Sequence, residues 1–425
     1  MPQSPITTLG TAASMSINVP TGTRMAGGAS SLIAARTVQG VGAALMNPAT
    51  LSIITATFPP RQRGTAIGIW AGVSALALAI GPIVGGLLTE KVSWSWIFFI
   101  NIPVGLVAIV LSPALLRETR DALARRSFDP AGALTIAGAL VLLVYAIVKA
   151  PDVGWNDVRT ILPLAGSALL LAAFALIESR HPAPLVPLRI FRSRTLAGAD
   201  ALTVLIGTVA VGMPFVLTLY AQQVLGYSAL KFGVSSVVLA VGATVGAIAG
   251  QAAVLKVGFR SAAGTGLALM AAGSLVLTQV SVYGSYFPDI FFGLLLCGLG
   301  IGLAFVTATV AALAGVAEHE AGLASGLSNT ALQIGTALGV AIVTSVAVSR
   351  SQHYLVAHKG ANALAALTEG YQSAFLACAV LAAIGLALAL LLPGRPQKAA
   401  HELPEPVLAA SAAAGGDVVI RSGAK

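Results

Sequence analysis

The chain is built from long apolar stretches separated by short polar connections. A helix needs about 20 mostly apolar residues to cross the hydrocarbon core of a bilayer. Eleven stretches reach this length, with ends expected to within about 2–4 residues: 30–57, 65–88, 95–116, 131–149, 160–178, 196–220, 229–254, 262–281, 287–315, 322–348 and 372–392. Because they are continuously apolar and do not alternate, they predict helices rather than a transmembrane β-barrel. We expect an all-α, polytopic membrane protein.

The composition excludes several other classes of protein. Only 9% of the residues are charged and 57% are hydrophobic, whereas about 25% of a soluble chain is charged. The net charge of +9 does not indicate nucleic-acid binding, because the Lys and Arg residues lie between apolar stretches rather than on one polar face. Cys297 and Cys378 lie inside apolar stretches and favour buried packing roles. No metal-ligand or catalytic spacing occurs, so we expect no metal, no cofactor and no enzyme activity.

The Lys and Arg residues of the connections predict the orientation in the membrane. The connections on one side, together with the C-terminal tail, carry 16 of these residues, and those on the other side carry 6. Cytoplasmic loops are enriched in Lys and Arg, so the first side and the C-terminus are expected in the cytoplasm. Eleven spans then leave the N-terminus outside, which indicates either a miscounted span or helices missing upstream.

The first stretch carries an arginine inside an apolar helix, in the run LIAARTVQGVGAAL. A central Arg costs about 2.5–3.5 kcal/mol on insertion, so Arg36 should face a polar interior. Gln39 lies three residues on and therefore on the same face, and Gly40 and Gly42 allow a neighbouring helix to approach closely. The alternative is that Arg36 lies near the outer interface and extends its charge into water.

The second stretch ends in LALAIGPIVGGLL. Gly81 and Pro82 interrupt regular helix geometry, and Gly85 and Gly86 present small faces to a neighbour. The pattern is typical of a kinked packing helix, and the functional alternative is that the same kink acts as a conformational hinge or a seal.

Together these residues resemble two signatures of the major facilitator superfamily, in its drug:proton antiporter branch with fourteen helices. Leu32, Arg36, Gln39, Gly40, Gly42, Ala43 and Ala44 are similar to the fourth-helix motif, and Gly81, Pro82, Gly85 and Gly86 to the fifth-helix antiporter motif. That motif normally opens with a further glycine, where this chain has Ala77. The resemblance extends from about residue 30 to residue 392. It implies that the family's first three helices, with their cytoplasmic loop motif, are absent.

The resemblance and the two longest basic connections predict five parts of the chain. These are an atypical N-terminal segment (1–29), the remainder of an N-terminal helical bundle (30–116), two linker helices with basic loops (117–194), a C-terminal six-helix bundle (195–392) and a disordered cytoplasmic tail (393–425).

Five further residues are candidates for the transport path. Asp200 lies well within an apolar stretch, where a carboxylate suggests proton coupling, although an interfacial salt bridge is the alternative. Asn329 and Gln333 are spaced i,i+4 and should share one face, either lining a cavity or bonding between helices. Trp70 and Asn101 are possible cavity residues, with aromatic packing or an interfacial belt as the alternative.

The resemblance implies a secondary active transporter in the cell membrane that exports small amphipathic or drug-like molecules in exchange for protons, by alternating access of two bundles. Its expected partners are the lipid bilayer, a small-molecule substrate and protons, and we expect a monomer that binds no nucleic acid. Arg36 is the expected coupling residue. The alternative is a truncated membrane protein that does not transport, because the family's carboxylate partners for Arg36 belong to the absent helices.

Overall fold

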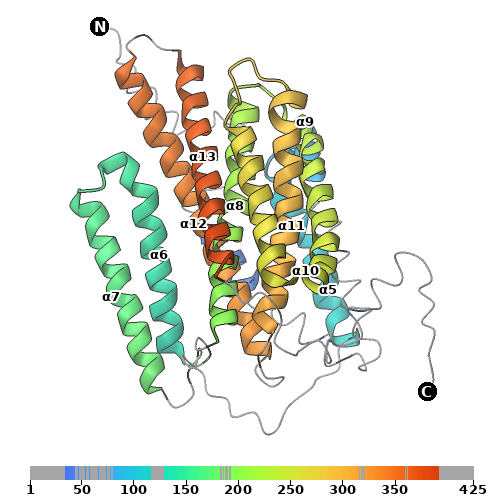
Figure 1. The fold of residues 1–425 in the computed structure, drawn as a ribbon, viewed down its shortest axis with the longest axis vertical. Helices are drawn as coiled ribbons and strands as arrows, with labels where there is room; N and C mark the ends of the chain where they lie inside the picture. The colour runs from blue at the N-terminus through green and yellow to red at the C-terminus, as the bar shows by residue number, and fades with distance from the viewer. Residues whose placement is uncertain are drawn as a thin grey trace, which may run out of the picture. The chain divides into compact units, whose positions relative to one another are not determined.

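The computed structural model describes residues 34–43, 46, 53, 57, 66, 73, 77, 80–115, 129–181, 184, 186, 190, 193–314, 316, 321–358, 360 and 362–391. The chain forms two compact units, residues 1–67 and residues 68–425. In the first unit, residues 34–43 form a helix. The second unit holds a helix over residues 80–91 and all the labelled helices of Figure 1.

The labelled elements follow one another along the second unit as helices only. They are α4 (Trp96–Phe99), α5 (Asn101–Leu115), α6 (Pro130–Val153), α7 (Val158–Arg180), α8 (Arg194–Gln223), α9 (Ala229–Ser235), α10 (Val237–Leu277), the π-helical turn η2 (Tyr286–Phe291), α11 (Phe292–Leu313), α12 (Ala321–Ala357) and α13 (Ala363–Ala389). No strand occurs among the described residues, so the predicted all-α fold class is confirmed.

Eight helical stretches among the described residues are long and apolar enough to cross a membrane. They are Trp96–Ala114, Pro130–Val153, Val158–Arg180, Thr195–Gln223, Ala229–Leu277, Tyr286–Leu313, Gly322–Ala357 and Ala363–Ala389. The stretch Ala229–Leu277 contains two of the predicted spans. The predicted spans 30–57 and 65–88 lie largely outside the described residues.

The last helix begins earlier than the predicted start at residue 372. Asn362 caps α13, because its Oδ1 accepts a hydrogen bond from the Leu364 N–H at 3.1 Å. The prediction missed this first part of the helix because Glu369 interrupts the apolar run.

A single glycine divides α10 into two helical segments. Gly258 has φ 80° and ψ 175°, a backbone conformation outside the helical region that side chains with a Cβ rarely adopt. It lies between the predicted spans 229–254 and 262–281, so the predicted break between them is confirmed. Each segment is therefore long enough to cross a bilayer by itself.

Both segments of α10 pack closely on α11, and glycines make the approach possible. In the first segment, a Cβ at Gly246 would overlap the backbone of Leu299, and a Cβ at Gly302 would overlap that of Ala243. In the second segment, a Cβ at Gly266 would lie 2.6 Å from the Ala304 backbone nitrogen. Close helix approach through small residues is a common way to hold helices together in lipid. Gly242, Gly246 and Gly250, spaced four residues apart, all lie in this contact.

The order of these contacts gives the direction of each segment. Along the first segment, contact positions on α11 rise from Gly298 to Leu303, so the two run parallel. Along the second segment they fall from Ala304 to Gly293, so the two run antiparallel. The chain therefore reverses at Gly258.

Helices α8 and α12 form a second close pair. A Cβ at Gly207 would lie 2.8 Å from the Leu332 carbonyl oxygen, and one at Gly335 would overlap the backbone of Val204. The contacts advance together along both helices, which therefore run parallel. The core of the bundle around them is fully buried and includes Leu202, Ile206, Met213, Leu217, Leu267, Met270 and Phe375.

Helices α6 and α7 form a hairpin, joined by a short turn at their upper ends in Figure 1. Inside it, the Ser167 hydroxyl donates a hydrogen bond to the Ala139 carbonyl at 2.8 Å. The hairpin is connected to the C-terminal bundle by α6, whose Ile147 carbonyl accepts a hydrogen bond from Ser345 of α12 at 3.0 Å. Because no water is available inside the bilayer, the two hydroxyl groups donate their hydrogen bonds to backbone carbonyls instead.

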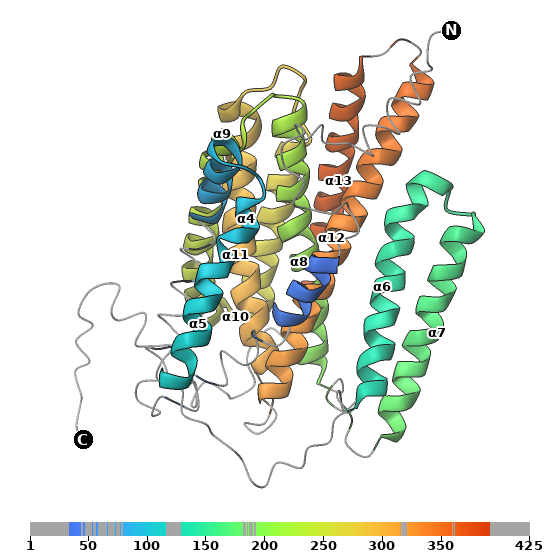
Figure 2. The same cartoon turned by 180° about the vertical axis from the view of Figure 1, so that it is seen from behind.

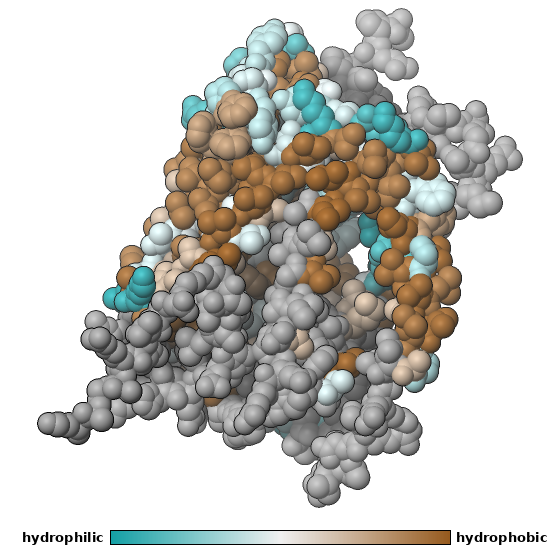
Figure 3. Space-filling view, turned by 90° about the vertical axis from the view of Figure 1, so that its right-hand side faces the viewer, coloured by the Kyte–Doolittle hydropathy of each residue, from teal (hydrophilic) through white to brown (hydrophobic). Residues whose placement is uncertain are grey.

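The surface of the described helices is mainly hydrophobic. Figure 3 shows hydrophobic residues across most of the coloured surface and hydrophilic ones gathered towards its upper end. Large apolar side chains such as Val110, Leu134 and Leu169 are more than two-thirds exposed. In water such a surface would be an aggregation hazard, whereas in a bilayer it faces lipid tails.

Candidate functional site

Arg36 and Gln39 form a local pair in the first unit. Arg36 Nη1 donates a hydrogen bond to Gln39 Oε1 at 2.9 Å, and both side chains lie on the exposed surface of the helix over residues 34–43. The i+3 spacing thus places them on one face, as the sequence predicts. Gly40 and Gly42, on the same helix, have room for a Cβ, with no atom within 4 Å of that position.

The helix of the predicted antiporter motif runs without interruption from residue 80 to residue 91 and lies beside α9 (Figure 2). A Cβ at Gly86 would lie 2.5 Å from the Ala229 carbonyl oxygen, and a Cβ at Gly233 would overlap the Pro82 carbonyl. Gly86 is buried, whereas Gly81 and Gly85 have no atom within 4 Å of a Cβ position. The contact therefore uses Pro82 and Gly86, one turn apart on one face.

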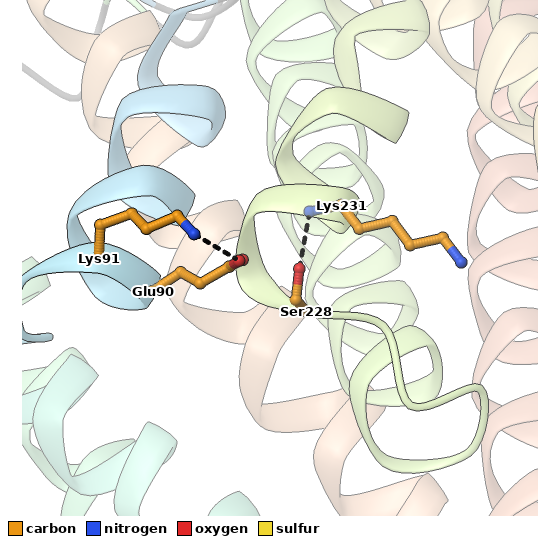
Figure 4. Close-up of polar contacts among 4 residues, drawn as sticks. All are labelled: Glu90, Lys91, Ser228 and Lys231. Atoms are coloured by element: carbon orange, nitrogen blue, oxygen red, sulfur yellow. Dashed lines mark hydrogen bonds and ion pairs between the residues drawn. The ribbon is translucent and has the colours of Figure 1, made fainter.

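Glu90 extends the same face by one more turn. Figure 4 shows its carboxylate directed at the first turn of α9, with the Lys231 side chain pointing away. Hydrogen bonding from the Ser228 hydroxyl lowers the pKa of Glu90, and the Leu230 N–H and the charge of Lys91 lower it further, while partial desolvation opposes them. Lys91 Nζ lies 3.8 Å from Glu90 Oε1. An ionised carboxylate therefore lies where two helices meet.

The start of α9 is itself well ordered by local contacts. Ser228 caps the helix by accepting a hydrogen bond from the Lys231 N–H at 3.2 Å. Lys231 Nζ lies 3.7 Å from the centre of the Tyr227 ring, a cation–π contact. Ser228, whose hydroxyl faces Glu90, is thus held in place by contacts within its own helix.

Asp200 lies in the contact between α8 and α12. Its side chain is 8% exposed, and its Oδ1 accepts a hydrogen bond from the Ser328 hydroxyl at 2.6 Å. Its Oδ2 is buried and has no hydrogen-bond partner in the described part of the chain. Among the described residues Asp200 takes part in no ion pair. Arg192 and the side chain of Arg194, the nearest basic groups in sequence, lie outside the described residues.

The other predicted cavity residues are placed as follows. Asn329 and Gln333 are both exposed on α12, next to the Asp200–Ser328 contact in sequence. Asn101 is exposed at the start of α5 and donates to the carbonyls of Ile97 and Phe98, at 3.1 and 3.3 Å. Trp70 lies outside the described residues.

The sequence interpretation did not single out Glu90 or Ser328. Glu90 follows Gly86 at i+4, so helical periodicity alone places it on the motif face. Ser328 precedes Asn329 and has no motif of its own, and only the packing of α12 on α8 brings it to Asp200.

Comparison with known proteins supplies the family. A model described as Major Facilitator Superfamily matches residues 6–340. The match begins within the segment 1–29 that the sequence interpretation set apart.

Several curated relatives carry export or resistance in their names. The chain is 37% identical to the tetracenomycin C resistance and export protein of Streptomyces glaucescens, over 77% of this chain and 60% of that one. It is 37% identical to the puromycin resistance protein of Streptomyces alboniger, over 77% and 65% of the two chains. It is 32% identical to the cephamycin export protein of Amycolatopsis lactamdurans, over 88% and 75%.

The chain thus spans less than two thirds of the length of the first two relatives. The family match nevertheless covers most of the chain, and the apolar helices described above are those of a multi-pass membrane protein. The chain belongs to the Major Facilitator Superfamily, a family of transporters rather than enzymes.

Proposed function

We propose that this protein exports small amphipathic or drug-like molecules across the cell membrane in exchange for protons, by alternating access. The observation that carries the proposal is the close contact of the antiporter-motif helix with α9, through Pro82, Gly86 and Gly233. Glycine lets two helix backbones approach closely, and in this proposal that close contact closes the transport path. The names of two relatives, the tetracenomycin C resistance and export protein and the cephamycin export protein, support export as the direction.

Proton coupling in this proposal depends on charges held in apolar surroundings. Ionisable groups inside a membrane protein are costly and are usually kept for function. Asp200 is such a group, since it is buried between α8 and α12 with one oxygen unpartnered. Arg36 provides a permanent positive charge on an apolar helix. We assign Asp200 to proton binding and Arg36 to sensing the charge state of the transport path.

The exposed polar face of α12 is the proposed substrate-contacting surface. Asn329 and Gln333 are one turn apart and exposed, and they follow directly on the residue that holds Asp200. A mostly apolar surface with a few polar groups suits amphipathic molecules of varied shape.

The test is export of a cationic dye from cells that express the chain, compared with empty cells. Asp200→Asn and Arg36→Ala are expected to abolish export. Asp152→Asn and Arg159→Ala are matched controls, because both residues are exposed near the turn between α6 and α7; they should export like the unchanged chain. Equal loss in the controls would contradict the assignment of Asp200 and Arg36.

The second candidate function is a membrane protein of this fold that does not transport. This candidate is based on the observation that the chain spans 60% and 65% of the length of the first two relatives. In that case the unchanged chain, although present and folded in the membrane, leaves dye accumulation equal to that of empty cells.

A further inference from the structure

Two buried carboxyl groups face each other at the base of the α6/α7 hairpin. Asp129 precedes α6 and is 1% exposed, and Glu178 lies in the last turn of α7 and is 3% exposed. Neither belongs to the contacts through which the proposed transport function is argued. The sequence interpretation singled out neither residue, because Glu178 ends the apolar run of α7 and Asp129 lies at the edge of a basic connection.

One oxygen of each carboxyl group has a clear structural role. Asp129 Oδ1 caps α6 by accepting from the Gly132 N–H at 2.8 Å. Glu178 Oε2 accepts from the Val186 N–H at 3.1 Å, in the connection that leads to α8. The first bond caps the start of α6, and the second joins the end of α7 to the connection.

The other two oxygens have no hydrogen-bond partner among the described residues. Both Asp129 Oδ2 and Glu178 Oε1 are fully enclosed. A Cβ at Gly132 would lie 2.5 Å from Asp129 Oδ2 and 3.0 Å from Glu178 Oε1, so both oxygens point at the same small space above Gly132. Two carboxylates that share a buried space repel each other unless a cation lies between them.

The groups around the two carboxylates determine which cation fits between them. Neither carboxylate takes part in an ion pair in the described part of the chain. Hard metal ions require six or more oxygen ligands, or near-octahedral coordination with bound waters, and no group of three or more acidic, His or Cys side chains is found among the described residues. A proton needs only the two oxygens, since one carboxyl donates its O–H to the other.

We propose that Asp129 and Glu178 form a proton-binding site, in which a single proton shared by the two carboxyl groups joins the start of α6 to the end of α7. The bound proton leaves the pair with one negative charge instead of two. Its loss restores the repulsion and loosens the junction of the two helix ends.

Among the described residues, few other charged groups lie near the pair. Arg180 and His181 follow Glu178, and their side chains are exposed and half-buried respectively. The first turn of α6 contains no acidic or basic residue, and the connection contributes the Val186 backbone N–H. Any measurement must therefore distinguish a carboxylic acid from a histidine.

Infrared spectroscopy of the purified full-length chain in lipid nanodiscs meets this need. A protonated carboxyl has a C=O stretching band that carboxylates, amides and imidazoles lack. We expect the band at neutral pH when both carboxyl groups of the pair are intact, its loss at alkaline pH, and its loss at neutral pH in both Glu178→Gln and Asp129→Asn. Asn is as good an N-cap as Asp, so Asp129→Asn keeps the start of α6 intact.

The spectra are recorded in the Asp200→Asn background, because Asp200 is a further buried carboxyl with an unpartnered oxygen and is itself proposed to bind a proton. Glu369→Gln, which changes an exposed glutamate on α13, is the control and should leave this band in place. A band that is absent at neutral pH, or that survives both substitutions in the pair, would overturn the proposal. A band that appears only when metal ions are chelated would also overturn it, because the occupant would then be a metal. The measurement does not require transport, so its result is separate from that of the dye assay.

Discussion

Asp200 depends on one side chain from another helix. Ser328 donates the only hydrogen bond that its carboxylate receives from the described residues. Hydrogen bonds to charged groups contribute about 1.5–3 kcal/mol. We expect Ser328→Ala to lower the free energy of unfolding by about this amount and to impair dye export more than Thr330→Ala, since Thr330 bonds only to its own helix. Equal effects of the two substitutions in the export assay would contradict a role of Ser328 at Asp200.

Glu90 predicts a dependence of stability on pH. Its pKa lies below the ordinary value of 4.5, so its contacts with α9 contribute stability above that value, and the contribution is lost as the pH falls through the lowered pKa. We expect the difference in unfolding temperature between the unchanged chain and Glu90→Gln to be present at neutral pH and to vanish in acid.

The control for this experiment is Glu369→Gln, which changes an exposed glutamate on α13. If the unchanged chain unfolds at a lower temperature than Glu90→Gln at neutral pH, the carboxylate opposes the contact rather than supporting it.

Side-chain positions were predictable from sequence only where the partner is close along the chain. Arg36 and Gln39 are three residues apart, and their shared face followed from helical periodicity. The partners of Asp200 and Glu178 lie on other helices or in a connection. Periodicity gives the face of a helix but not its neighbour, so these contacts required the fold.

At the scale of helices, Gly86 and Gly85 differ in whether the contact with α9 requires a glycine at that position. A Cβ at Gly86 would overlap the backbone at the start of α9, whereas one at Gly85 would meet nothing within 4 Å. We expect Gly86→Ala to destabilise the protein by about 1–3 kcal/mol through overpacking. Gly85→Ala should be neutral or slightly stabilising, because alanine favours the helix. Thermal unfolding in detergent measures both, and equal effects would refute the contact.

The helices themselves were largely predictable from sequence, since long apolar runs leave few alternatives in a membrane. The break at Gly258 also agreed with the predicted gap between two spans. What sequence did not provide was the pairing of parallel and antiparallel neighbours, because small residues permit a close approach on any face that carries them.

At the scale of the whole molecule, the distribution of Lys and Arg predicts which side each turn occupies. The turn between α6 and α7 should lie outside and the end of α7 in the cytoplasm. We expect Trp155→Cys to react with a membrane-impermeant maleimide in intact cells, and Ser179→Cys to react only after permeabilisation. Both positions are exposed, and the two native cysteines are buried and give little background. The reverse labelling pattern would invert the predicted topology.

The pairing of helices also bears on the order in which the protein assembles during synthesis. The two segments of α10 and their partner α11 are consecutive in the chain, so they can associate as soon as α11 enters the bilayer. Helix α8 enters earlier but its close neighbour, α12, emerges only after α11. Until then the Asp200 carboxyl lacks the Ser328 hydroxyl, although α8 already has α11 to pack against. The slow step of biogenesis is therefore expected at the arrival of α12.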